Sequence, residues 1–75
     1  MVYTIVSSNS NKYVYCELGM IKESEDICQI FPEKKEAEEE AKKILNLLML
    51  SKKYKEDIPF IPKVISHNIK FYFKD

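Results

Sequence analysis

The strongest constraint on the fold is that one stretch of the chain, residues 33–53, repeats its apolar side chains with the period of an α-helix. The residues that share one helical face, at spacings of four, three, one and three, are Ala37, Ala41, Ile44, Leu45 and Leu48. Glutamates crowd the first half of this segment and lysines follow them, an order that matches the helix macrodipole. We therefore predict one long helix whose apolar face covers a sheet.

The apolar residues outside the helix form short runs rich in β-branched and aromatic side chains, which are typical of strands. We predict strands over residues 2–7, 13–18, 27–31 and 69–74, with an apolar, proline-containing loop over 56–63 that packs across one end of the core. The resulting order is β-β-β-α-β. We predict an α+β fold in which the helix packs on one face of a small sheet of order 3-2-1-4, and the other face is open to solvent.

The length of 75 residues allows one hydrophobic core, so we predict that residues 1–75 form a single domain. The sequence contains no apolar run near the roughly 20 residues of a membrane span, and its start lacks the layout of a signal peptide. We expect a cytoplasmic protein without a membrane partner. All of the 12 cationic residues are lysine, and the absence of arginine disfavours specific reading of nucleic acid.

The residue types that carry catalysis or hold metals are sparse. Cys16 and Cys28 lie 12 residues apart, which fits no zinc pattern, and we expect both to be reduced, small and buried within strands. His67 stands alone, and we expect it at a turn or strand end. With one glycine and no nucleotide-binding or metalloprotease motif, the sequence predicts a protein that is not an enzyme and takes no cofactor.

Two groups of side chains exceed what the fold needs. Leu47, Met49 and Leu50 spread around the helix beyond its core face. Either the loop over 56–63 buries them, or they form a partner or self-association surface. Tyr13 and Tyr15 share the strand face opposite the helix side, where tyrosines pair across strands, contact a protein or stack bases.

The formal charge of zero conceals a strong separation of sign along the chain. Residues 23–40 hold eight acidic residues against two lysines, whereas residues 41–75 hold eight lysines against three acidic residues. Such an acidic segment either is a solvated face or attracts a basic protein surface. Together with the apolar helix end, the candidate partner-binding residues are Glu23, Glu25, Asp26, Glu36, Glu39, Glu40, Leu47, Met49 and Leu50.

The tyrosine-rich hairpin, the Ile-Phe-Pro that follows it and the pattern Phe-Pro-x-Lys-x-x-Ala-Glu over residues 31–38 resemble small orphan proteins of phages and prophages of low-GC Gram-positive bacteria. The resemblance covers about the first 45 residues and defines no functional motif. It implies a non-enzymatic protein that binds and modulates a host or defence protein in the bacterial cytoplasm, as an anti-CRISPR-like inhibitor or a host-takeover factor does.

Two alternatives stay open beside this leading hypothesis. The first is a single-strand nucleic-acid binder that uses Tyr13 and Tyr15 with Lys12, Lys70 and Lys74. The second is a homodimeric structural or regulatory protein assembled through Leu47, Met49 and Leu50.

Overall fold

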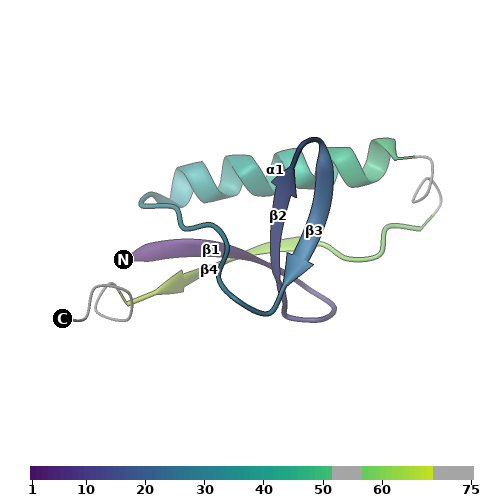
Figure 1. The fold of residues 1–75 in the computed structure, drawn as a ribbon. Helices are drawn as coiled ribbons and strands as arrows, with labels where there is room; N and C mark the ends of the chain where they lie inside the picture. The colour runs from purple at the N-terminus through teal and green to yellow at the C-terminus, as the bar shows by residue number, and fades with distance from the viewer. Residues whose placement is uncertain (52–56, 69–75) are drawn as a thin grey trace.

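A computed structural model describes residues 1–51 and 57–68, which form a four-stranded antiparallel sheet with one helix packed against it (Figure 1). The elements are β1 (Val2–Ser7), β2 (Tyr13–Glu17), β3 (Met20–Ser24), α1 (Lys34–Leu50) and β4 (Pro62–His67). The strands lie in the order β3-β2-β1-β4. This confirms the predicted α+β fold, its β-β-β-α-β order and the position of the last strand beside the first.

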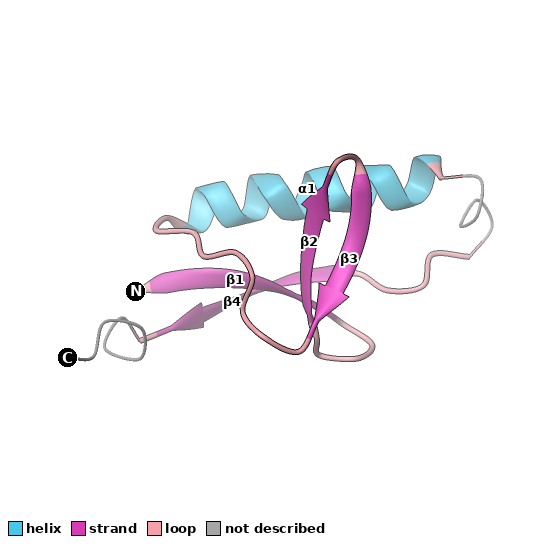
Figure 2. Ribbon diagram, viewed as in Figure 1, coloured by secondary structure: helices cyan, strands magenta, loops and turns pink. Residues whose placement is uncertain are grey.

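Strand β1 holds the sheet together, but it pairs very unequally with its two neighbours. It pairs with β4 over six residues, from Val2↔His67 to Ser7↔Pro62, and with β2 through Val6↔Tyr13 within the described residues. At its other end the backbones of Tyr3 and Phe31 exchange two hydrogen bonds of 2.9 Å. The β2–β3 hairpin therefore leaves β1 near its base and crosses in front of α1 (Figure 2).

The predicted third strand over 27–31 is wrong, because the chain turns back earlier than expected. Leu18 and Gly19 form a two-residue turn in which both φ angles are positive, 53° and 76°, and β3 follows at once. Of the predicted segment, Phe31 alone takes part in the sheet, through its bridge to Tyr3. Residues 20–24, which lie between the predicted second and third strands, thus form an edge strand.

The last two residues of the predicted loop over 56–63 belong instead to a strand. β4 starts at Pro62, where a strand tolerates proline because its first residue need not donate a ladder hydrogen bond. The predicted strand over 69–74 lies outside the described residues. The helix ends at Leu50, and the backbone N–H of Ser51 donates to the carbonyl of Leu47 at 3.0 Å. Residues 52 and 53, predicted as helical, also lie outside the described residues.

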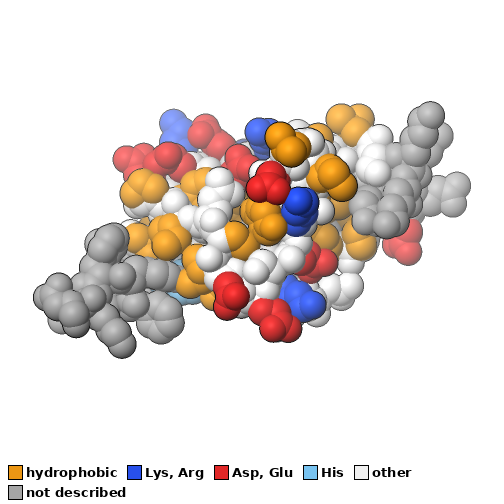
Figure 3. Space-filling view, viewed as in Figure 1, with side chains coloured by type: hydrophobic (Ala, Val, Ile, Leu, Met, Phe, Trp, Pro, Cys, Tyr) orange, Lys and Arg blue, Asp and Glu red, His pale blue; other side chains and the backbone are white. Residues whose placement is uncertain are grey.

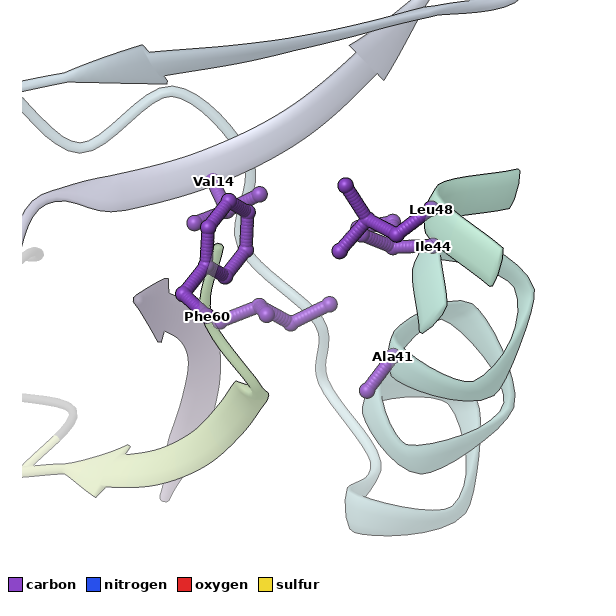
Figure 4. Packing of buried hydrophobic residues seen from close by; sticks show 6 residues of the cluster. Val14, Ala41, Ile44, Leu48 and Phe60 are labelled. Carbon is purple, nitrogen blue, oxygen red and sulfur yellow. The ribbon is translucent and has the colours of Figure 1, made fainter. Parts of the chain in front are cut away.

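The hydrophobic core lies between α1 and the facing side of the sheet (Figure 4). Its buried members are Ile5, Val14, Ala41, Ile44, Leu48 and Phe60. The predicted helical face is confirmed at Ala37, Ala41, Ile44 and Leu48, whereas Leu45, at the margin of that face, is only half-buried. Full burial of a leucine or isoleucine contributes about 1.5–3 kcal/mol, so Ile44 and Leu48 fasten the helix to the sheet.

The loop before β4 packs across one end of this core, as predicted. The Asn9 side-chain amide donates to the carbonyl of Pro59 at 2.8 Å, and the backbone N–H of Ile61 donates to Ser8 Oγ at 2.9 Å. These bonds tie the loop to the β1–β2 turn, and Phe60 of the loop joins the buried core on the side of Val14 (Figure 4).

The open sheet face predicted from the sequence is not found along β1. Because side chains alternate along a strand, Val2, Thr4 and Val6 lie opposite Ile5, yet all three are buried. Thr4 is fully buried, and its Oγ1 lies 2.8 Å from Nε2 of His67. His67 is the last residue of β4, which agrees with the predicted strand end.

Candidate functional site

An apolar groove of about 550 Å³ lies between β3 and the end of α1. Its lining, called the groove below, comprises Gly19, Met20, Ile21, Glu23, Leu47, Leu48, Leu50, Ser51 and Phe60. In the space-filling view, hydrophobic side chains gather over the hairpin and the end of α1, and acidic ones over the start of α1 (Figure 3). The groove therefore lies where the sequence placed the apolar helix end.

Helical spacing explains why α1 contributes one wall. Ile44 and Leu48 point into the core, so Leu47 and Leu50, three residues apart, lie together on the adjoining flank. Leu47 is half-buried and Leu50 is 81% exposed. The alternative in which the loop over 56–63 buries this helix end does not hold at Leu50, which is exposed although Phe60 of that loop is buried in the core.

The opposite wall comes from β3, whose residues lie between the predicted second and third strands. Ile21 faces the helix side of the hairpin and packs against the core. Leu18 and Met20 lie closer to the turn. Met20 is 63% exposed and Leu18 is 95% exposed. The signal that marks these residues is the pair Leu18-Gly19, because the single glycine of the chain allows the tight turn and places two apolar side chains at its tip.

Met49, predicted in one surface with Leu47 and Leu50, is separated from them by the geometry of the helix. Successive residues of an α-helix lie about 100° apart, so Met49 lies on the flank that Leu45 occupies. It is 54% exposed and is not among the groove residues. The structure thus brings Leu47 and Leu50 together and leaves Met49 elsewhere.

Of the acidic candidates, Glu23 is the one that lines the groove. Its Oε1 accepts a hydrogen bond of 2.7 Å from Ser10 Oγ, which fixes the carboxylate at the edge of the hairpin. Glu25 and Asp26 are exposed directly after β3, so they extend the acidic character beyond the same end of the strand. The groove is therefore apolar near the hairpin turn and acidic near the end of β3.

The helix glutamates form a separate group at the other end of α1. Glu36 and Glu39 are exposed and Glu40 is half-buried, and none of the three lines the groove. Among residues 1–51 and 57–68 the one ion pair joins Lys22 to Glu17 at 2.8 Å. The helix carboxylates thus have no lysine within ion-pair distance in the described part of the chain.

The tyrosine pair lies on the face of the hairpin opposite the groove. Tyr13 and Tyr15 alternate with the buried Val14 and are half-buried. Lys22, opposite Tyr15 in the register, donates to Glu17, and this hydrogen bond raises the pKa of Lys22 above its ordinary value. The cation beside the tyrosines is thus already paired within the chain.

The other residues proposed for nucleic-acid binding are three lysines. Lys12 is exposed in the β1–β2 turn, whereas Lys70 and Lys74 lie outside the described residues. The nucleic-acid alternative therefore stays a prediction.

Both cysteines are free thiols, but they are less buried than predicted. Cys16 is half-buried in β2, whereas Cys28 is exposed in the loop after β3, where its Sγ donates to the carbonyl of Asp26 at 3.3 Å. The prediction of a buried strand position for Cys28 is wrong because the chain has already left the sheet. No metal-binding cluster of His, Cys, Asp and Glu occurs among the described residues.

Comparison with known proteins adds no family to this description. No protein-family model, curated protein sequence or solved structure matches the chain. In the described part of the chain, no helix is long and apolar enough to cross a membrane.

Proposed function

We propose that this chain is a non-enzymatic protein-binding module that inhibits or modulates a bacterial host or defence protein through the groove. The observation that carries the proposal is the exposure of Met20 and Leu50 along one apolar groove, with Leu18 exposed in the turn beside the lining residue Gly19. Contiguous exposed apolar side chains are typical of interaction sites, since leaving them in water contributes nothing to folding.

The chemistry of the groove supports binding rather than catalysis. Among the described residues that line the groove, Glu23 is the one acidic or basic side chain and Ser51 the one with a hydroxyl. General acid–base catalysis needs a titratable group aimed at a reacting atom, commonly with a second group that orients it. A mostly apolar lining with one carboxylate instead suits a protein surface that offers apolar side chains and a cation.

The proposed cellular role rests on the resemblance of residues 31–38 to small phage proteins together with the charge of the chain. The acidic segment 23–40 supplies long-range attraction toward a basic surface. A host or defence protein that handles nucleic acid carries such a surface.

The test is affinity capture from a lysate of a low-GC Gram-positive host with wild-type protein and two single variants. Leu50→Ser changes the groove, and Met49→Ser changes another exposed apolar residue of the same helical turn on the other flank. We expect a specific protein to be recovered by wild type and Met49→Ser but not by Leu50→Ser. Recovery of no specific protein, or equal loss in both variants, would contradict the proposal.

Light scattering on the purified chain separates the homodimer alternative. We expect the mass of one chain, 8.9 kDa. A mass of twice that value in wild type that reverts to one chain in Leu50→Ser would assign the groove to self-association instead.

A further inference from the structure

The outer side of β3 presents unpaired backbone groups beside the groove. β3 is an edge strand, and its register with β2 starts at Glu17↔Met20, the pair that closes the two-residue turn. In an antiparallel pair, hydrogen-bonded and non-hydrogen-bonded positions alternate from such a closing pair. The backbone groups of Ile21 and Glu23 therefore point away from β2, and no other described residue accepts or donates a hydrogen bond to them.

The side chains of the same two residues line the groove. Ile21 and Glu23 both appear in its lining, between the sheet edge and the Leu47–Leu50 flank of α1. A strand added alongside β3 would point every second side chain to this face, because side chains alternate along a strand. The edge supplies main-chain hydrogen bonds, and the groove supplies room for alternate side chains, which is the arrangement of β-strand addition.

We propose that an extended segment of the partner protein adds to β3 as a further strand and places alternate side chains in the groove. The segment carries apolar residues opposite the Met20 end and a lysine or arginine opposite Glu23, close to the exposed Glu25 and Asp26. This inference rests on the proposed function, because it specifies how the same groove recognises its partner.

The charges on β3 favour a different protein over a second copy of this chain. Antiparallel pairing of two β3 strands that overlaps all five residues joins Ile21 to Glu23 and sets Lys22 opposite Lys22. Like charges directly opposite one another destabilise a strand pair. A segment with a cation near Glu23 gains attraction at the position where a second copy gains none.

The experiment selects short peptides from a random library on the full-length chain and then maps how they bind. We expect enriched peptides to alternate apolar and polar residues and to carry a lysine or arginine toward one end. On binding, the amides of Ile21 and Glu23 should be protected from hydrogen exchange. Methylation of the peptide's pairing backbone nitrogens, which removes donors and keeps side chains, should weaken binding about tenfold or more.

Two variants at one position separate the backbone contribution from the charge. Glu23→Pro removes the charge together with an outward N–H that has no hydrogen-bond partner among the described residues, whereas Glu23→Gln removes the charge and keeps that N–H. We expect Glu23→Pro to lose peptide affinity about tenfold and Glu23→Gln about threefold, with binding of the latter less dependent on salt than binding of the wild type. A urea transition confirms that each variant is folded.

Several results would overturn strand addition. These are a library without binders, enriched peptides with helical spacing, unprotected Ile21 and Glu23 amides in the complex, or a second copy of the chain on β3. Failure of strand addition is distinguishable from failure of the proposed function. If a host protein is captured by wild type and lost in Leu50→Ser, yet leaves both amides unprotected, the function stands and the mode of binding is wrong.

Discussion

At the scale of single residues, Leu18 stands out because neither its backbone nor its side chain favours the observed fold. Its φ of 53° lies in the left-handed region, which costs a branched apolar residue about 1 kcal/mol relative to the usual turn residues. Its side chain is 95% exposed, so it gains no burial in return. Because both its backbone conformation and its exposed side chain oppose folding, we infer that Leu18 has a role in binding.

We predict that Leu18→Asn stabilises the fold, because asparagine tolerates positive φ and favours the first position of such a turn. The free energy of unfolding in urea should rise by about 0.5–1 kcal/mol. Capture of the partner should weaken in the same variant. The matched control is Leu18→Ala, which keeps the Cβ in its strained position and should change stability by less than about 0.5 kcal/mol. Destabilisation by Leu18→Asn would contradict this account of the turn.

Asn9 joins two distant segments through one side chain, since its amide donates to the carbonyl of Pro59. We predict that Asn9→Ala lowers the free energy of unfolding by about 0.5–1.5 kcal/mol and accelerates hydrogen exchange in the loop before β4. Asn46→Ala, on the exposed side of α1, serves as the control and should be neutral or slightly stabilising. Unchanged exchange in the loop of Asn9→Ala would show that Phe60 is held by packing alone.

At the scale of elements, α1 contributes to both the core and the groove, and two leucines near its end show the difference. Leu48 is 1% exposed within the core, whereas Leu50, two residues later, is 81% exposed at the groove. The helix stays attached to the sheet through the first face while the flank with Leu47 and Leu50 remains available.

We predict that Leu48→Ala lowers the free energy of unfolding by about 2–5 kcal/mol, through lost burial and the cavity left behind. Leu50→Ala should change the free energy of unfolding by less than about 0.5 kcal/mol, because the Leu50 side chain is exposed to water in the folded state as well as in the unfolded state. Urea unfolding of both variants checks the difference. A Leu50→Ala cost comparable to that of Leu48→Ala would place Leu50 in the core and remove it from the groove.

The elements also show what the sequence predicts well and what it does not. Residues 2–7 and the core face of α1 follow from composition and period, because both are buried and their patterns are strong. β3, with the sequence Met-Ile-Lys-Glu-Ser, buries little, so no alternation marks it as a strand. Residues 27–31 look more strand-like, but a tight turn at Leu18 has already supplied the third strand. Strand β4 was missed for another reason, because its first residue is a proline of the predicted loop.

The candidate site was predicted in part, at Glu23, Leu47 and Leu50. Leu47 and Leu50 follow from helical spacing, since they exceed what one core face can bury. Leu18, Met20 and Ile21 were missed because their role depends on the turn that brings the edge strand over the helix. Tertiary arrangement, not local pattern, creates the groove.

At the scale of the whole molecule, the hairpin that carries half of the groove is weakly joined to the rest of the sheet. β1 and β4 share six paired residues, whereas β1 and β2 share Val6↔Tyr13 within the described residues. The hairpin is held mainly by Val14, Cys16 and Ile21 packing toward α1. Opening of the hairpin therefore breaks fewer hydrogen bonds than opening of the β1–β4 pair.

We predict that native-state hydrogen exchange separates these two parts. Amides of β1 and β4 should exchange through global unfolding, and those of β2 and β3 through a local opening at least about 1 kcal/mol lower in free energy. Leu18→Asn, which relieves strain within the hairpin, should reduce the difference between the free energies of global unfolding and local opening. Leu50→Ala should leave this difference unchanged. Equal protection across all four strands would mean that helix packing couples the hairpin to β1 as firmly as a full ladder. A partner strand on β3 would then bind a rigid edge rather than order a loosely attached one.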